Sequence, residues 1–349
     1  MWSFLSSFLF ALLITPLVIH FYRRHNWLDD PEQNQHVKKT HSQAVPRGGG
    51  LVIFLATFLA ALLILDFDKY LLAIFVGASL LTVVGFIDDI FDISPYLRLA
   101  TGLLASLIVV GAGIGIAYVS NPFGNGVIHL DQPQLILTLF GETRSIWILS
   151  SLFATFFILW NMNIINWSKG LDGQLPGFVS VSCLFIAILA NQFADNPTQF
   201  NVANLALIVS GAFAGFLVWN FYPQKIMPGY GAGSLAGYFL SILAILSGAK
   251  VATTLMVLAI PTADGIFTIA RRILAGKSPF WGDRGHLHHK LMDYYGWGRR
   301  RVAIFYILSS AALGLLSLYL DTTGKIIAIC TTSLIVFSFL VYSKIKQHG

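Results

Sequence analysis

Apolar residues along the chain gather into long runs that are separated by short polar segments. About eleven of these runs approach the ~20 residues that an α-helix needs to cross a bilayer. Such long, unbroken runs favour helices over barrel strands, the other structure that satisfies its own backbone polar groups in lipid. The runs cover residues 3–22, 48–66, 69–87, 99–118, 145–164, 174–191, 204–222, 232–248, 251–270, 303–320 and 325–343. The pattern predicts an all-α, polytopic membrane protein of about 11 transmembrane helices, with residues 1–349 forming a single integral-membrane domain.

Composition and charge predict how this bundle lies in the membrane. Of the 349 residues, 56% are hydrophobic and 11% are charged, against about 25% charged in an ordinary soluble domain. Most of the 22 lysines and arginines lie in alternate segments between the runs, and the positive-inside rule places those segments in the cytoplasm. The N-terminus is then outside, the C-terminus is cytoplasmic, and the first run is interpreted as a retained span. The net charge of +6 reflects this asymmetry and requires no nucleic acid.

The expected cytoplasmic segments hold nearly all the residues that could do chemistry. The first is basic and carries Lys38, Lys39, His41 and Arg47. It ends in three glycines at 48–50, whose bare backbone would let a ligand approach closely. The alternative is a basic loop that only fixes the topology.

A carboxylate cluster lies at the inner end of the third run. Ionisable residues at membrane depth are costly, so a functional role is the default hypothesis. Asp88 and Asp92 are four residues apart and would share one helix face, with Asp89 beside them. Such carboxylates can bind a divalent cation or activate a phosphate oxygen. The alternative is a solvated helix end before Ser94 and Pro95, which are typical of the start of the next helix.

Two glycine-containing segments follow later in the chain. The first ends the fifth run with a density of polar residues that is unusual for membrane packing, and its glycines would break the helix. It carries Asn163, Asn166, Lys169, Gly170, Asp172 and Gly173. The second, residues 222–234, is a glycine-rich approach to the eighth run, where a helix N-terminus could bind phosphate. The alternatives are an ordinary turn for the first and close helix packing for the second.

The segment from 271 to 290 concentrates cations around His286, His288 and His289. Such a loop suits a phosphorylated ligand, to which histidines and arginines can donate hydrogen bonds. Zinc is a weaker alternative, because no cysteine is near and the surrounding cations disfavour a metal. Arg272 could instead extend its side chain from the span to the membrane interface.

Taken together, these segments resemble the polyprenyl-phosphate N-acetylhexosamine-1-phosphate transferases over essentially the whole chain. The matching residues are His41, Pro46, Arg47, Gly49 and Gly50, then Asp88 and Asp89, then Asn163, Asn166, Gly170, Asp172 and Gly173, and finally His286, His288 and His289. The spaced histidines and about eleven runs resemble the GlcNAc-1-phosphate branch of the family. The branch that uses the MurNAc-pentapeptide nucleotide usually has three consecutive histidines and fewer spans.

The resemblance implies a reaction and its participants. N-acetylhexosamine-1-phosphate, expected to be GlcNAc-1-phosphate, passes from a UDP-sugar to polyprenyl (undecaprenyl) phosphate. UMP leaves, and a lipid-linked cell-envelope glycan begins. The implied place is the cytoplasmic face of a bacterial plasma membrane, among membrane lipid. The oligomeric state stays open, with a homodimer as one form.

The resemblance also implies roles for particular residues. Asp88, Asp89 and Asp172 would be catalytic. Mg²⁺, the implied cofactor, would be held by Asn166, Asp172 and Asp89. The substrates would contact Lys38, Lys39, His41, Arg47, Asn163, Asn166, Lys169, Arg272, His286, His288 and His289.

The chain departs from the family pattern at two positions that usually carry carboxylates. Lys169 replaces the first aspartate of the Asp-Gly-x-Asp-Gly element, and the aspartate usually found before the eighth span aligns with Gly231. Losing two negative charges and gaining one positive charge shifts the local charge by about +3, which alters the expected cation site.

Three hypotheses follow from this departure. The enzyme holds Mg²⁺ with Asp88, Asp89, Asn166, Asp172 and the substrate itself. Alternatively, the Lys169 ammonium replaces part of the metal's role, or the chain binds a lipid phosphate or a partner without catalysis. A transporter is the alternative from another class, and the gathering of polar residues at one membrane face argues against it.

Overall fold

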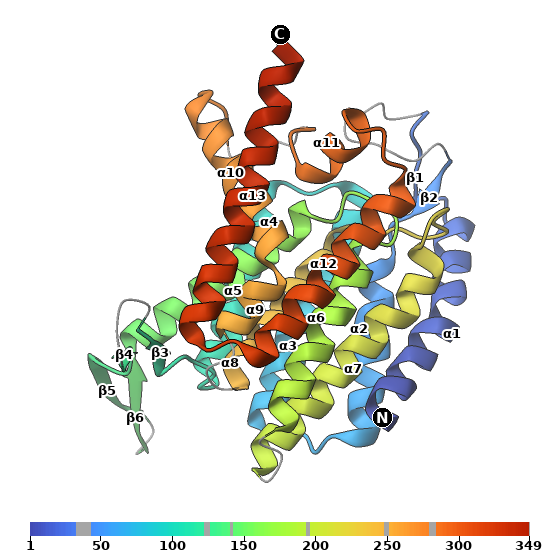
Figure 1. The fold of residues 1–349 in the computed structure, drawn as a ribbon. Coiled ribbons are helices and arrows are strands. Elements are labelled where there is room, and N and C mark those ends of the chain that lie inside the picture. The colour runs from blue at the N-terminus through green and yellow to red at the C-terminus, as the bar shows by residue number, and fades with distance from the viewer. Residues whose placement is uncertain are drawn as a thin grey trace.

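The structure, a computed structural model, describes residues 1–32, 43–121, 126–139, 142–192, 196–247, 251–278 and 284–348. The described residues form a helical bundle with short strands at both ends (Figure 1). The helices are α1 (Trp2–Arg24), α2 (Gly49–Ile64), α3 (Lys69–Phe91), α4 (Pro95–Gly111), α5 (Ile148–Trp167), α6 (Gln174–Asn191), α7 (Pro197–Asn220), α8 (Gly229–Leu246), α9 (Val251–Val257), α10 (Ala259–Leu274), α11 (Leu287–Asp293), α12 (Arg299–Tyr319) and α13 (Thr322–His348).

The helices confirm a multi-pass membrane protein. Within the described ranges, eight helices are long and apolar enough to cross a bilayer. α9 and α10 pass the same test only as a pair, which is bent by 75° at the break between them. α2 and α4 are apolar but shorter, with 16 and 17 residues. Each predicted run therefore contains a helix or this bent pair, while eleven complete spans and their sidedness remain predictions.

The short strands form three separate antiparallel pairs. β1 (Leu28–Asp29) pairs with β2 (Val45–Pro46). The segment between α4 and α5 forms two further pairs, β3 (Tyr118–Ser120) with β4 (Val127–His129) and β5 (Gln134–Leu139) with β6 (Glu142–Trp147).

The two chain termini lie at opposite ends of the bundle (Figure 1). β1, β2 and α11 lie toward the end that carries the C-terminus, whereas β3 to β6 lie toward the other end. The segments predicted to be cytoplasmic thus gather at one end.

The turn from α3 into α4 places the carboxylate cluster. α3 ends at Asp92, whose left-handed backbone (φ 48°) stops the helix. α4 then starts with Ser94 as its N-cap, whose side chain accepts a hydrogen bond from the Leu97 amide, and with Pro95 in the first turn. This start is the one that the sequence predicted. Asp88 and Asp89 consequently lie in the last turn of α3, facing the first turns of α4.

Helix α8 is the centre of the bundle, with every residue from Gly229 to Ile245 buried. Its Gly231 packs against the backbones of Gly50 in α2 and Gly85 in α3. A Cβ built on Gly85 would lie 2.6 Å from the Cα of Gly231, and one built on Gly50 would lie 2.8 Å from it. The prediction that the glycines at 48–50 receive a ligand is not supported at Gly50, because its bare backbone serves this helix contact. The glycines of α8 likewise allow close packing.

We expect Gly85→Ala to lower the thermal stability of the purified protein in detergent by about 1–3 kcal/mol, because the added methyl meets backbone that cannot move aside. Gly111→Ala is the matched control, since nothing lies within 4 Å of a Cβ there. Equal melting temperatures for the two variants would contradict the proposed role of the glycine contact.

Candidate active site

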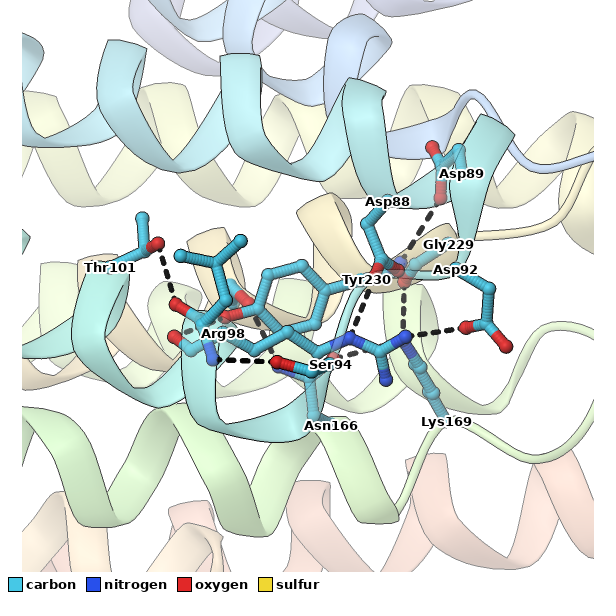
Figure 2. A network of polar contacts seen from close by, with 12 residues as sticks. Asp88, Asp89, Asp92, Ser94, Arg98, Thr101, Asn166, Lys169, Gly229 and Tyr230 are labelled. Carbon is cyan, nitrogen blue, oxygen red and sulfur yellow. Dashed lines mark hydrogen bonds and ion pairs between the residues drawn. The ribbon is translucent and has the colours of Figure 1, made fainter.

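An arginine joins the end of α3 to the start of α4 through two ion pairs, of which only the Asp88 carboxylate is buried. Arg98 Nε donates to Asp88 Oδ1 at 2.6 Å, and Arg98 Nη2 donates to Asp92 Oδ1 at 2.5 Å. Asp88 is fully buried, and Figure 2 shows Arg98 between the two carboxylates. One arginine therefore bridges Asp88 and Asp92, although Asp92 is the left-handed residue that ends α3 and not part of its buried face. Among the described residues, Asp88 Oδ2 is buried and has no hydrogen-bond partner.

Lys169 reaches from the segment after α5 into the same cluster (Figure 2). Its Nζ donates to the Gly229 carbonyl at 2.6 Å and to Asn166 Oδ1 at 2.9 Å. Asn166 is itself fixed, because its Nδ2 donates to the Met162 carbonyl and to Ser234 Oγ, each at 2.9 Å. The ammonium is thus held between two oxygens that belong to a rigid part of the bundle.

Electrostatics around Lys169 are finely balanced. Burial and the Arg47 and Arg98 charges together lower its pKa to about 7, against the opposing effect of Asp88 and Asp89. An anionic ligand beside the amine would favour the protonated form. Arg47 also acts electrostatically on Asp89, so the first basic segment contributes a positive charge to the cluster.

Tyr230 supplies an aromatic wall to this cluster. The Arg98 guanidinium and the Lys169 ammonium lie 5.4 and 5.8 Å from its ring centroid. Its hydroxyl donates to the Arg98 carbonyl at 3.0 Å, and its amide donates to Asp89 Oδ1 at 3.3 Å. The side chain at position 230 therefore enters the network. A Cβ at Gly231 would instead lie 3.2 Å from the Gly50 Cα, away from these charges.

Asp172 is buried at the next bend of the same segment. Its Oδ2 accepts a hydrogen bond from the Gln224 amide at 3.3 Å and lies 3.8 Å from Arg299 Nη1 at the start of α12. The carboxylate thus interacts with the loop after α7 and with an arginine that the sequence reasoning did not select.

The predicted histidines form a buried cluster around α11. His286 Nδ1 lies 2.9 Å from Asp264 Oδ2 in α10, and Arg272 Nη2 lies 3.4 Å from His286 Nε2. Asp264 Oδ1 also accepts the Leu287 amide hydrogen at 2.8 Å. Asp264 therefore attaches α11 to α10 and positions the first histidine.

The other two histidines stack behind the first. The His286 and His288 rings are 5.6 Å apart and nearly parallel, and the His288 and His289 rings are 4.3 Å apart. Burial lowers the pKa of His288 well below its usual value and that of His289 to about 4; neighbouring histidines and Arg284 add to both shifts. Both rings are therefore neutral near pH 7 and suited to donate or accept hydrogen bonds.

Gly170 connects the histidine cluster to the lysine cluster. A Cβ built on Gly170 would lie 2.9 Å from His288 Cδ2, so this bare backbone is where His288 packs. Lys169 is the next residue back along the chain. The carboxylates, the lysine and the histidines therefore form one continuous polar region at one end of the bundle, as the sequence predicted.

For four predicted substrate-binding residues the role stays a prediction. Asn163 uses its amide on its own helix, with Nδ2 donating to the Leu159 carbonyl at 2.8 Å. Lys38, Lys39 and His41 lie outside the described residues.

The sequence reasoning also missed four contributors, namely Arg98, Tyr230, Asp264 and Arg299. Arg98 could have been found as an arginine in the first turn of the helix after the carboxylate cluster. Asp264 could have been found as an aspartate within an apolar run.

The residues present do not fit the magnesium site that the family pattern implies. The Asn166 oxygen already accepts a hydrogen bond from Lys169, and Asp172 contacts a different loop. Three carboxylates of the cluster face three cations, Arg98, Lys169 and Arg47, so little net negative charge is left for a divalent ion. Within the described ranges, no group of three or more His, Cys, Asp or Glu residues could hold a metal ion.

The lowered pKa of His289 predicts a loss of stability in acid. The unfolded ring titrates near 6.5 and the folded ring at about 4, so its contribution is present above pH 6.5 and is lost as the pH falls toward 4. The expected loss is up to about 3 kcal/mol. Arg284 and His286 oppose the charged ring, while Asp293 and Asp264 favour it.

His289→Gln should therefore flatten the fall in melting temperature between pH 6.5 and pH 4. His20→Gln is the control, since His20 is exposed on α1. An unchanged acid sensitivity in His289→Gln would contradict the neutral, buried state of the ring.

Comparisons with known proteins agree with this arrangement. The sequence profile of glycosyl transferase family 4 matches residues 71–248, about half of the chain. A probable undecaprenyl-phosphate N-acetylglucosaminyl 1-phosphate transferase of Bacillus subtilis is 29% identical, over 88% of this chain and 81% of that protein. A decaprenyl-phosphate N-acetylglucosaminephosphotransferase of Mycolicibacterium smegmatis is 26% identical, over 89% and 81%.

Transferases with a different sugar in their name are also similar to most of this chain. A phospho-N-acetylmuramoyl-pentapeptide-transferase of Bacillus pumilus is 28% identical, over 92% of this chain and 97% of that protein. The matched segment of the family profile contains the carboxylate cluster, Lys169 and Tyr230, and ends before the histidines. The chain therefore belongs to glycosyl transferase family 4.

Proposed function

We propose that this protein transfers an N-acetylhexosamine-1-phosphate, GlcNAc-1-phosphate in the first instance, from its UDP-sugar to a polyprenyl phosphate and releases UMP. We further propose that it does so at the cytoplasmic face of a bacterial plasma membrane, with eleven spans, the N-terminus outside and the C-terminus inside. The names of its relatives and its membership of the family support the reaction.

One observation carries the proposal for this chain. The buried carboxylates Asp88 and Asp172, the half-buried Lys169 and the neutral histidines of α11 form one polar region at an end of an otherwise apolar bundle. A lipid phosphate can reach such a region from the bilayer, while a nucleotide can enter it from the aqueous side. A lipid-soluble substrate and a water-soluble substrate can thus bind in the same site.

The charges in this region suit a reaction between two anions. Phosphoryl transfer depends mainly on positioning and on electrostatic stabilisation of the phosphoryl oxygens. Asp88, whose Oδ2 is free of hydrogen-bond partners within the described part of the chain, is placed to orient the lipid phosphate or to accept its proton. Lys169, Arg47 and the histidines are placed to hold the nucleotide's phosphates.

The proposal is tested with purified full-length protein, undecaprenyl phosphate and radiolabelled UDP-GlcNAc, with MgCl₂ present. We expect a lipid-linked sugar and an equal amount of UMP. Asp88→Asn should reduce the rate by about 100-fold or more, because it removes a buried carboxylate from the reacting groups. Asp66→Asn is the control, since Asp66 lies exposed between α2 and α3 at the other end of the bundle.

Two other outcomes would reject the reaction. Binding of UDP-GlcNAc without product in every condition would indicate a family member that has lost catalysis. Accumulation of intact nucleotide sugar inside proteoliposomes would indicate a transporter.

A further inference from the structure

We propose that the Lys169 ammonium is the resident cation of this site, and that the site binds the diphosphate of its nucleotide-sugar donor without a divalent metal ion. The inference rests on the proposed function and specifies how the donor is held. It starts from the disagreement between the magnesium site that the family pattern implies and the residues that occupy the region.

The first step is the position of the ammonium. Its Nζ lies 2.6 Å from the Gly229 carbonyl oxygen and 2.9 Å from Asn166 Oδ1. The Asp88 and Asp89 charges act on it from α3. Neutral oxygens with carboxylates close by are the surroundings that a magnesium ion would require. In this chain, they surround a lysine.

The second step is rigidity. Asn166 is held by Ser234 and the Met162 carbonyl. The backbone at 229–230 is held where the Tyr230 amide donates to Asp89. Lysine side chains usually lose much conformational freedom on binding an anion, but here that freedom is already lost in the folded protein. The ammonium is therefore preorganised, as a bound metal ion would be.

The third step is the remaining bonding capacity. An ammonium has three N–H donors, and two of them are used by the oxygens above within the described residues. One donor is left for a ligand. The buried Asp88 Oδ2 also has no hydrogen-bond partner there. Unsatisfied buried polar groups are costly, so this oxygen is ready to accept a hydrogen bond from a ligand that enters beside Lys169.

The fourth step is the charge balance. Asp88 and Asp92 are paired with Arg98, and Asp89 interacts electrostatically with Arg47 and Lys169. A divalent ion would add two positive charges to an already neutralised cluster, whereas a diphosphate adds negative charge beside a lysine and an arginine. The cluster as it stands therefore favours an anion over a metal ion.

The chemical step balances without a metal ion. An oxygen of the lipid phosphate attacks the β-phosphorus of the UDP-sugar and forms the new P–O bond. The bond between the β-phosphorus and the bridging oxygen breaks, and its electron pair leaves with UMP. Lys169 and Arg47 are placed to neutralise charge on the phosphoryl oxygens during this exchange.

The experiment compares turnover in excess EDTA with turnover in MgCl₂ for the wild-type protein, Lys169→Met, Lys169→Arg and Lys225→Ala. Lys169→Met keeps the straight side chain without its charge. Lys225→Ala removes an exposed lysine that lies over Trp219. We expect wild-type rates within about twofold of each other in the two buffers. Lys169→Met should lose about 100-fold in both buffers, Lys169→Arg should retain part of the activity, and Lys225→Ala should match the wild type.

A second readout does not depend on turnover. We expect UDP-GlcNAc to bind the wild-type protein in EDTA by calorimetry, and the affinity to fall about tenfold or more in Lys169→Met. Lys169→Asp should acquire a rise in melting temperature on addition of MgCl₂ that the wild type lacks, because it removes the ammonium and adds a carboxylate. Melting curves without ligand establish that each variant is folded.

The outcomes separate this inference from the proposed function. A wild-type rate that is lost in EDTA and restored by MgCl₂ would overturn the inference, while the proposed transferase function would still hold. Full activity in Lys169→Met would do the same. If no product forms in any buffer, the proposed function fails, and the calorimetry then decides the inference. Metal-free binding that Lys169→Met abolishes would support it, and binding that Lys169→Met leaves unchanged would overturn it.

Discussion

Helices α2, α3 and α8 touch backbone to backbone at Gly50, Gly85 and Gly231, and this contact sets the distance between the carboxylates and Lys169. Asp88 and Asp89 lie within one turn of Gly85, and the Gly229 carbonyl lies two residues before Gly231. Any side chain at these glycines would push the three helices apart. The Lys169 ammonium, held by an α8 carbonyl, would then lose the carboxylate charges of α3.

Burial makes the charges in this region interdependent. A buried carboxylate without a partner is strongly destabilising, whereas a paired one is close to neutral for stability. Asp88 depends on Arg98, and Arg98 also binds Asp92. The main effect of such a network is to hold each group in one geometry. Its contribution to the stability of the fold is small. That restriction is useful where two anionic substrates must be held in line, since misplacement of reacting groups lowers the rate steeply.

Local patterns in the sequence predicted the parts of the site that depend on neighbours along the chain. The closeness of Asp88 and Asp92 follows from their spacing of four residues at the end of α3, and the helix start at Ser94 follows from capping. The bond from Lys169 to the Gly229 carbonyl spans 60 residues, and no local rule predicts it. The role of Asn163 stays a prediction, because a helix-end asparagine can bond its own backbone as well as a ligand. The apolar run at 251–270 likewise gave no sign of the 75° bend between α9 and α10.

The two departures from the family pattern are best understood as one coupled change. An aspartate at 169 with a second carboxylate on α8 would leave the cluster with more carboxylates than cations, a situation that calls for a divalent ion. Placing a lysine at 169 while keeping the second carboxylate would let that carboxylate compete with the diphosphate for the ammonium. Removing the second carboxylate while keeping the aspartate would weaken metal binding and supply no replacement cation. With Lys169 present and Gly231 in place of a carboxylate, the charges balance, and the ammonium remains available to an incoming phosphate.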